Sequence, residues 1–435
     1  MPVTQPYFQP EIETMSRERL DVLQRERLLR LVGHAFANAP LYRERCRAAG
    51  IRPADIRSIA DFQAATPLLG KADLVDYRDR YGDPYCGLLT VAPHRVNKIG
   101  TSSGTTAEPM PLVELVDGAA PFASSVRDMW GAGLRPGDTV LHVMATQRGP
   151  QERVYHQLGC IPLMVNLRQG ADWSVAFDMI RRHRPASIYL MGPMIAELDR
   201  LSQDHDLRAI FACTKFAVVS GEPLGARMRR RLTEEWGLKL HDVTGAADTG
   251  VAWDCSEHDG FHLWDDYVFA ECIDPKTGTP VPDGEPGELV CTALANLAWP
   301  LVRHRSGDLV RLIRTPCACG RTHSRFHLLG RVSDTLKVAG TTILPTTLWA
   351  AIEQLDETAA AVFQIIHPGG DAVTQLRLRI GYNPRRTAAV ADVEARLRAA
   401  ILQATGLVPL IDLMTEEALL ARSPSGIKLP RVARA

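Results

Sequence analysis

The sequence predicts an α/β protein with a large N-terminal α/β domain over residues 1–332 and a smaller α+β domain over 333–435. A chain of 435 residues exceeds what one hydrophobic core fills, since domains run to about 100–200 residues. After residue 137, short apolar runs alternate with helical stretches, which is typical of βαβ units. After Gly330 and Arg331 a separate strand-and-helix pattern begins, so we expect the second domain there.

The large domain shows three sequence patterns, one after the other along the chain. In 16–50 leucines recur at helical spacing among arginines and glutamates, which predicts an amphipathic helix. Three apolar runs predict strands of a mostly parallel sheet, with helices over 173–183 and 224–236. These runs are Val140–Ala145, Ile188–Met191 and Phe216–Val219. Residues 262–316 are strand-rich with turn signals, which favours antiparallel pairs packed beside the main sheet.

The C-terminal part has its own core pattern. Leu376, Leu378 and Ile380 alternate with polar residues as in a half-buried strand. A helix follows whose apolar face we expect to pack on that strand, and its residues are Val390, Val393, Leu397 and Ile401.

Composition excludes several classes of function. Lys plus Arg number 50 and Asp plus Glu number 50, and no basic run resembles the footprint of a nucleic-acid binder. The first residues include Glu11 and Glu13, and no apolar stretch approaches the length of a membrane span. We therefore expect a cytoplasmic protein that uses neither nucleic acid nor membrane. Nine cysteines in such a chain indicate reduced thiols or metal ligands.

The most distinctive segment is a Ser/Thr-rich loop. It contains Ser102, Ser103, Gly104, Thr105 and Thr106 after a predicted strand. Hydroxyls and backbone amides of such a loop donate to phosphate oxygens, although taken alone the composition is also that of an ordinary turn. It is not a Walker A loop, because the spacing and the lysine of that motif are absent.

The loop and the motifs that follow it resemble those of adenylate-forming enzymes, and the chain resembles the phenylacetate–coenzyme A ligases within that superfamily. The matching motifs run in the same order over essentially the whole chain. They are Ala39–Arg45, Pro67–Leu74, Thr101–Pro109, Ser220–Leu224, Gly287–Val290, Pro300–Asp308, Cys317–Arg321, Gly330–Asp334 and Ser425–Lys428.

This resemblance implies a reaction in two steps, which uses ATP, Mg²⁺, a small-molecule carboxylic acid and coenzyme A. The carboxylate attacks the α-phosphate of ATP to give an acyl-adenylate and pyrophosphate, and a thiol then attacks the acyl carbon and releases AMP. Such a reaction needs phosphate donors, a metal ligand and a cation rather than a protein nucleophile. The acid implied is aromatic or arylacetic, and the C-terminal domain is expected to rotate between the two steps. A homodimer is left open.

Residue roles follow from the same resemblance. The expected catalytic residues are Lys428, Asp248 as the Mg²⁺ ligand, and Thr105 of the phosphate loop. Lys428 would bridge the carboxylate and the α-phosphate, whereas without the upstream motifs it reads as a solvated tail lysine. The expected nucleotide-binding residues are Ser102, Ser103, Gly104, Thr105, Thr106, Gly221, Glu222, Pro223, Thr244, Asp308 and Arg331, with Asp308 accepting from the ribose hydroxyls. The expected acyl-pocket residues are Gln147, Arg148, Gly245 and Ala246, and for Gln147 and Arg148 a surface loop is the alternative.

Four positions depart from the family pattern. Thr244 stands where an aromatic residue is usual, and Asp248 replaces a Glu and is one methylene shorter. Ala107 stands where Gly is usual, and Ser333 stands where an Asp hinge is usual. These departures put the rate of adenylation and the ease of domain rotation in doubt.

A second site is indicated by cysteine spacing. Cys255 and His258 form a C-x-x-H pair, and Cys317 and Cys319 form a C-x-C pair, which together give the four ligands of a structural Zn²⁺. His262 is a spare that could replace His258 or face the acyl pocket. The alternative is reduced cysteines in ordinary strands. A closed site of this kind would organise the segment 255–320.

Two other functions remain open. An adenylating enzyme of a biosynthetic pathway would pass its acyl group to an amine or a carrier-protein thiol. A degenerate relative would bind nucleotide or acyl ligand without turnover.

Overall fold

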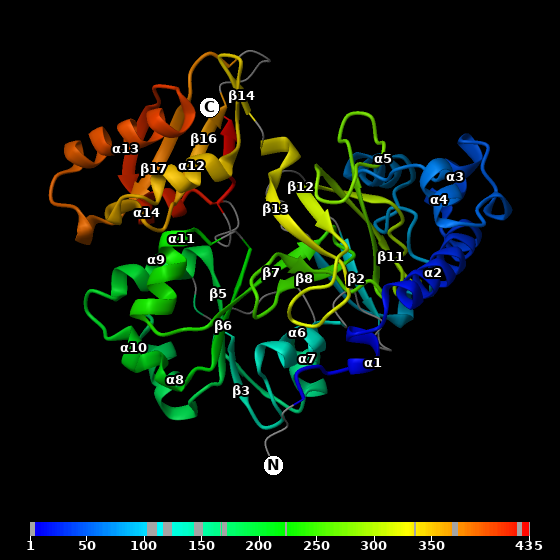
Figure 1. Ribbon diagram of the computed structural model, residues 1–435, viewed down its shortest axis with the longest axis horizontal. Helices are drawn as coiled ribbons and strands as arrows, with labels where there is room; N and C mark the ends of the chain where they lie inside the picture. The colour runs from blue at the N-terminus through cyan, green and yellow to red at the C-terminus, as the bar shows by residue number, and fades with distance from the viewer. Residues whose placement is uncertain are drawn as a thin grey trace.

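A computed structural model describes residues 5–101, 111–115, 124–142, 151–165, 167, 172–221, 224–334, 336–367, 373–423 and 429–434 (Figure 1). The helices are α1 Pro10–Glu13, α2 Arg17–Asn38, α3 Pro40–Ala48, α4 Ile59–Ala65, α5 Lys71–Tyr81, α6 Ser125–Ala132, α7 Gln151–Gln157, α8 Ser174–His183, α9 Gly192–Leu201, α10 Leu207–Ile210, α11 Ala226–Arg230, α12 Pro345–Ile352, α13 Val390–Thr405 and α14 Glu416–Leu420. The short turns are η1 Pro53–Asp55, η2 Pro93–Arg95, η3 Phe211–Cys213, η4 Arg231–Glu235, η5 Val332–Asp334, η6 Asp356–Thr358 and η7 Pro384–Arg386.

The strands fall into two main sheets and two small ribbons. In the large sheet they are β3 Thr139–His142, β4 Ile161–Met164, β5 Ser187–Met191, β6 Phe216–Ser220, β7 Leu240–Ala246, β8 Gly250–Asp254, β9 Phe261–His262, β10 Val268–Ile273, β11 Pro286–Ala293, β12 His304–Ile313 and β13 Arg325–Arg331. The C-terminal sheet contains β16 Phe363–His367, β17 Arg377–Tyr382, β18 Leu410–Thr415 and β19 Val432–Arg434, and the ribbons pair β1 Val96–Thr101 with β2 Pro111–Leu115 and β14 Leu336–Val338 with β15 Thr341–Ile343.

The large sheet joins a parallel half to an antiparallel half. Within the described residues it has eleven strands in the order β10-β11-β12-β13-β9-β8-β7-β6-β5-β3-β4. The strands from β7 through β6, β5 and β3 to β4 run parallel, and those from β7 to β10 run antiparallel. The antiparallel pairing predicted for 262–316 is confirmed, but these strands continue the main sheet, so the expectation that they pack beside it as separate pairs is wrong. The β7–β8 hairpin reverses the chain within one sheet and so makes this continuity possible.

The parallel strands β5 and β6 are largely buried on both faces, as their apolar composition predicts, whereas β4 exposes Ile161 and Met164. Val218 belongs to a core with α6 and α7, whereas its neighbour Val219 belongs to a core with α8 and α9. Successive side chains of a strand point to opposite faces, so the unbroken apolar run of β6 serves two layers. The predicted helix 173–183 is confirmed as α8, whereas 224–236 becomes α11 followed by the π-helical turn η4.

The C-terminal unit has a core of its own between its sheet and α12 and α13. Val393, Leu397 and Ile401 are buried there as predicted, but Val390 is 42% exposed because it is the first residue of α13. In Figure 1 this unit, orange to red, lies directly above α9 and α11.

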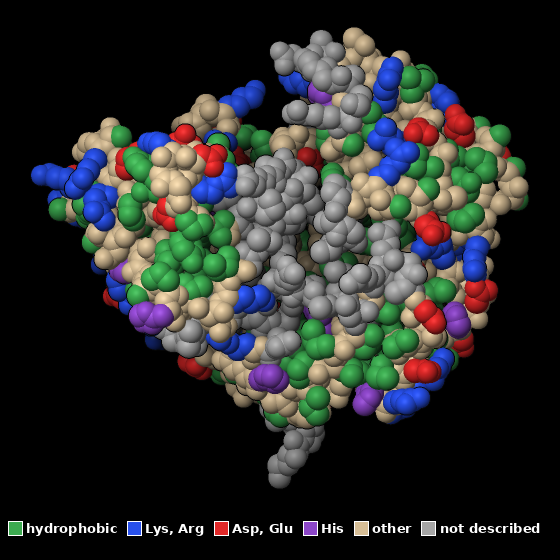
Figure 2. All heavy atoms as spheres, turned by 180° about the vertical axis from the view of Figure 1, so that it is seen from behind, with side chains coloured by type: hydrophobic (Ala, Val, Ile, Leu, Met, Phe, Trp, Pro, Cys, Tyr) green, Lys and Arg blue, Asp and Glu red, His purple; other side chains and the backbone are tan. Residues whose placement is uncertain are grey.

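The surface carries both signs of charge. Figure 2 shows basic and acidic side chains interspersed over the face seen from behind. In the described part of the chain, no helix combines the length and apolar character that crossing a membrane requires.

Candidate functional site at the sheet edge and a cysteine cluster

The first part of the site lies where β6 and β7 end side by side. The two strands are parallel and pair Ser220 with Val243, so Gly221 follows β6 next to Thr244 of β7. Gly221 has φ of 93°, a left-handed conformation that glycine adopts without strain. The carboxyl ends of parallel strands are where open α/β sheets bind ligands. Thr244 is partly exposed there and Gly245 is exposed.

Asp248 is presented by the tight turn between β7 and β8. Ala246 pairs with Gly250, and the intervening Ala247 and Asp248 have φ of 50° and 56°. Non-glycine residues rarely adopt this conformation, and it is concentrated at functional sites. Thr249 fixes the turn, since its hydroxyl donates to the Ala246 carbonyl at 2.6 Å. The carboxylate of Asp248 is consequently held at the sheet edge and only partly buried.

Asp308 and Arg331 form the third part. They pair directly across β12 and β13, and Arg331 Nη1 donates to Asp308 Oδ1 at 2.8 Å. The Asp308 side chain is 16% exposed and Arg331 is 41% exposed. The backbone N–H of Asp308 also donates to the Ser306 hydroxyl at 2.8 Å. The carboxylate is thus oriented by charge and by its own strand while remaining accessible.

Two residues behind the site escaped the sequence reasoning. Glu288 is buried, accepts from the Gly307 amide at 3.1 Å and pairs with Arg305 at 2.5 Å, so it fixes the turn before Asp308. His304 is buried, and its Nδ1 has no hydrogen-bond partner among the described residues. Burial lowers the pKa of His304, although the charge of Asp248 acts in the opposite direction. Both residues lie inside motifs noted in the sequence, but alternation alone does not say which motif residues face the site.

Contacts behind the strands bring these parts together. Ala246 and Ala247 of the Asp248 turn pack in one buried cluster with Cys291 of β11 and Val310 of β12. The turn at Asp248 therefore faces the strand that carries Asp308. Ser102 to Thr106, Gln147, Arg148, Glu222, Pro223 and Lys428 lie outside the described residues, as does Ala107.

The donor set at Asp248 suits one divalent cation held jointly with phosphate. Mg²⁺ in phosphate-transfer sites takes one or two carboxylates and completes its shell with substrate phosphates and water. The partly exposed carboxylate of Asp248 fits that arrangement.

The cysteine cluster gathers four ligand atoms from two hairpins. Cys255, His262, Cys317 and Cys319 place one ligand atom each within 4.8 Å of one another. Cys255 Sγ and Cys317 Sγ are 3.8 Å apart, and Cys319 Sγ and His262 Nε2 are 3.6 Å apart. A tetrahedral Zn²⁺ with bonds of about 2.3 Å to sulfur and about 2.0–2.1 Å to nitrogen has edges of about 3.8 Å and about 3.6 Å. The four side chains therefore fit a closed zinc site.

The histidine of the cluster is His262 and not His258, which corrects the C-x-x-H assignment. His258 has φ of 51°, and its Nδ1 lies 2.5 Å from Asp254 Oδ2, with the side chain 47% exposed. The left-handed turn directs its ring to Asp254. His262 instead sits on β9, paired with Trp253 and Arg325, and is fully buried.

The cluster is sealed by aromatic rings and by the N-terminal segment. Trp253 and Trp264 pack against the cysteines. Arg321 donates to Cys319 Sγ at 3.8 Å and pairs with the buried Glu13 at 2.8 Å. Tyr7 donates its hydroxyl to the Cys319 carbonyl at 2.9 Å. Interaction with Cys255, and then with His262, lowers the pKa of Cys319 to about 2, so a thiolate is favoured within the cluster.

The known proteins that resemble this chain in sequence are phenylacetate–coenzyme A ligases. No family model matches the chain. The phenylacetate–coenzyme A ligase of Thermus thermophilus is 32% identical over 360 residues, which cover 80% of this chain and 79% of that protein. The enzyme of the same name from Pseudomonas putida is 33% identical over 352 residues, covering 78% and 76%.

Solved structures resemble the whole chain. 2-Hydroxyisobutyryl-CoA ligase in its postadenylation state is 23% identical, covers 100% of this chain and 94% of its own, and superposes with a TM-score of 0.86. In its thioesterification state the TM-score is 0.71 at 24% identity, covering 100% and 93%.

The fold is therefore that of the adenylate-forming CoA ligases. At 32% identity over four fifths of its length, the chain belongs to the phenylacetate–coenzyme A ligase family, which consists of AMP-forming acid–thiol ligases.

Proposed function

We propose that the protein activates an aromatic or arylacetic carboxylic acid with ATP and transfers the acyl group to coenzyme A. The observation that carries this proposal is the placement of Gly221 and Asp248 at the ends of β6 and β7, with the Asp308–Arg331 pair on strands that share a core with the Asp248 turn, in a chain of the ligase family. The acid is inferred from the relatives, which are named for phenylacetate.

In the first step a carboxylate oxygen of the acid bonds to the α-phosphorus of ATP, and the bond to the β-phosphate oxygen breaks to release pyrophosphate. Ser102 to Thr106 would hold the phosphates, and Asp308 would accept from the ribose hydroxyls with Arg331 beside it. Glu222 and Pro223 would line the adenine together with Gly221 and Thr244. Lys428 would stabilise the charge that builds up on the reacting oxygens, because an ammonium placed there binds the transition state more strongly than the ground state.

Asp248 would hold Mg²⁺. That cation, when bound, neutralises charge on the departing pyrophosphate. The shorter Asp is held by its strained turn, in which the Thr249 hydroxyl donates to the Ala246 carbonyl.

In the second step the thiol sulfur of coenzyme A bonds to the acyl carbon and the thiol proton passes to solvent. The bond from the acyl carbon to the bridging oxygen breaks, and AMP departs with that oxygen. Gly245 and Ala246, with Gln147 and Arg148, would line the acyl pocket. The domains 1–332 and 333–435 would change their relative orientation between the steps. The Cys255 cluster would hold Zn²⁺ as a purely structural ion, since its four ligands leave no open position.

Acid-dependent exchange of pyrophosphate into ATP tests this proposal. The panel should contain benzoates, arylacetates and aliphatic acids, and AMP release should then be measured with and without coenzyme A. We expect exchange with arylacetates and AMP release that requires coenzyme A. AMP release that does not require coenzyme A would point to an amine or a carrier-protein thiol as the acyl acceptor. An Asp308→Asn variant that exchanges pyrophosphate like wild type would remove Asp308 from the nucleotide site.

A further inference from the structure

The C-terminal unit is joined to the parallel half of the large sheet by a set of charged contacts, here called the docking junction. On the N-terminal side it comprises Asp199, Gly225, Arg227 and Arg231, and on the C-terminal side Trp349, Glu353, Asp356, Asn383 and Arg386. Asp199 is 1% exposed and accepts from Arg231 at 2.6 Å, Asn383 at 3.1 Å and Arg386 at 3.2 Å. A buried carboxylate of one unit is thus completed by two side chains of the other.

Asp356 makes the reciprocal contacts. It accepts from Arg227 at 3.1 Å and from Arg231, both of the N-terminal unit, and from Arg386 at 3.1 Å. Burial opposes ionisation of Asp356, but the hydrogen bond from Arg227 and the charges of Arg231 and Arg386 lower its pKa. Removing one member of such a network leaves the other charges unpaired, which costs more than losing an isolated surface pair.

Glu353 connects the junction to the segment 220–225, which contains three of the expected nucleotide-binding residues. Its two carboxylate oxygens accept from the amides of Ala226 at 3.1 Å and Arg227 at 3.0 Å, the first two residues of α11. These amides have no partner within their own helix, so a carboxylate of the other unit satisfies them. The helix begins five residues after Gly221, so the docked C-terminal unit holds the end of the segment 220–225.

Gly225 shows how close the two units come. A Cβ at this position would lie 2.1 Å from Glu353 Oε2 and 2.3 Å from Trp349 Nε1. Its φ of −66° and ψ of 156° are open to any residue, so its own backbone does not require glycine. Glycine is required at this position because the docked C-terminal unit leaves no room for a side chain.

The docked arrangement matches one stage of the reaction. The postadenylation structure superposes better than the thioesterification structure of the same ligase. Leu429, which follows Lys428, is buried in one cluster with Ala196 of α9. The junction and the residue beside the expected adenylation lysine thus belong to the same orientation of the two units.

We propose that Gly225, Glu353 and Asp356 are positioning residues that hold the C-terminal domain docked for adenylation. Each of the three makes contacts that cross between the two units, and these crossing contacts stabilise the docked orientation and are lost when the domain turns to the thiol step. The proposal rests on the proposed function for its chemistry. A weaker junction lowers the fraction of molecules competent for adenylation, and leaves the later step unimpaired.

The experiment compares the two half-reactions in full-length protein. Gly225→Ala should reduce phenylacetate-dependent pyrophosphate exchange by about tenfold or more. Conversion of supplied phenylacetyl-adenylate and coenzyme A to thioester should stay within about twofold of wild type, because that step uses the undocked orientation. Equal losses in both half-reactions, or no loss in either, would overturn the proposal.

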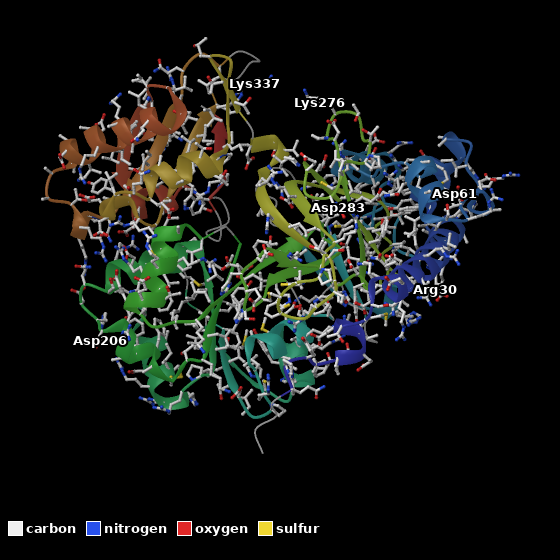
Figure 3. The ribbon with its side chains drawn as sticks, viewed as in Figure 1. Arg30, Asp61, Asp206, Lys276, Asp283 and Lys337 are labelled. Carbon is white, nitrogen blue, oxygen red and sulfur yellow. The ribbon has the colours of Figure 1, made fainter. Side chains whose placement is uncertain are left out.

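Asp356→Asn is the second variant, which tests the junction without steric strain. Its matched control is Asp283→Asn, since Asp283 is also ion-paired with an arginine, Arg314, and is 44% exposed against 42% for Asp356. Asp283 lies on the antiparallel side of the large sheet (Figure 3). Asp356→Asn should lower exchange by about threefold to tenfold, whereas the control should leave it unchanged.

A readout that needs no turnover separates this proposal from the proposed function. The Ala226 and Arg227 amides bonded to Glu353 should exchange hydrogen slowly in wild type and faster in both junction variants, measured on a peptide covering α11. If wild type exchanges no pyrophosphate with any acid, the proposed function fails while this measurement still decides the junction. Unchanged protection of α11 in both variants would overturn the junction.

Discussion

The cysteine cluster and the docking junction both remove polar groups from water, but they do so in opposite ways. Cys255, His262 and Cys317 are at most 5% exposed, enclosed by tryptophans and closed by the N-terminal segment. The junction is buried at Asp199, but Arg227 and Asp356 are 32% and 42% exposed at its rim. Water can replace a partner at the rim as the junction opens, whereas the cluster has no such path. If the cluster holds Zn²⁺ and the docking junction opens between the two steps, as proposed, the cluster is a permanent fastening and the junction a reversible one.

The largest expected effect comes from breaking the permanent fastening. Cys317→Ser should release metal and lower the free energy of unfolding by more than about 4 kcal/mol, since structural zinc contributes directly to folding. Metal content and denaturant unfolding would measure this. Cys160→Ser is the control, because that buried cysteine lies outside the cluster and donates to the Arg135 carbonyl. A Cys317→Ser protein that keeps its metal and its unfolding midpoint would remove the zinc proposal.

The next largest effect concerns Lys428, which the docking junction is proposed to bring into place for adenylation. Lys428→Ala should reduce adenylation by about 100-fold or more, while ATP binding is nearly unchanged. Pyrophosphate exchange and calorimetric ATP titration would measure the two quantities. Lys337→Ala is the control, because Lys337 is exposed on β14 of the same unit (Figure 3). Turnover like that of wild type would exclude Lys428 from the reaction.

A third prediction concerns pH and the reversible fastening. Glu416 is buried next to the junction, and no hydrogen-bond partner for its carboxyl oxygens occurs among the described residues. Burial, and then the charge of Asp199, raises the pKa of Glu416 from 4.5 to about 8, against the opposing charges of Arg200, Arg386 and Arg231. A raised pKa means that the folded state binds the proton more tightly, so stability falls as pH rises from about 4.5 to about 8.

Glu416→Gln should remove this pH dependence. Wild type should lose about 1.4 kcal/mol of unfolding free energy for each pH unit within that window, relative to the variant. Denaturant unfolding at a series of pH values would measure the difference. Parallel profiles for the two proteins would show that Glu416 ionises normally.

The smallest effect separates the two histidines near the cluster. His258→Ala should cost about 1–2 kcal/mol and retain the metal, because the partner Asp254 is buried but keeps its bond from the Asp242 amide. His262→Ala should behave like Cys317→Ser. If His258→Ala loses metal and His262→Ala does not, the ligand assignment from the structure is wrong.

The sequence predicted the family, the fold class and three of the four cluster residues. Family membership is confirmed. The three cysteines of the cluster are also confirmed, and they were recognisable from the C-x-x-H and C-x-C motifs in which they occur. For the fourth ligand the sequence favoured His258 and named His262 as the alternative, because His262 reaches the cluster through strand pairing with β13, which spacing does not encode. The roles assigned to Asp308, Arg331 and Lys428 remain predictions.

The docking junction had no signal in the sequence. Asp199 and Asp356 are ordinary surface-type residues in their own segments and become partners of the same arginines only when two folded units meet. Gly225 likewise reads as a turn glycine before α11. Glycine is required there because Trp349 and Glu353, which belong to the other unit, lie too close for a side chain. Contacts between units depend on orientation, and local periodicity carries no information about orientation.

The strand order of the large sheet also sets when it can be completed during synthesis. β9 pairs with β8 on one side and with β13 on the other, although β13 is made only after β10, β11 and β12. A growing chain therefore carries an open strand edge at Phe261 and His262 until Arg325 has left the ribosome. Cys317 and Cys319 emerge just before β13, so sheet closure and assembly of the cysteine cluster fall in the same short interval of translation.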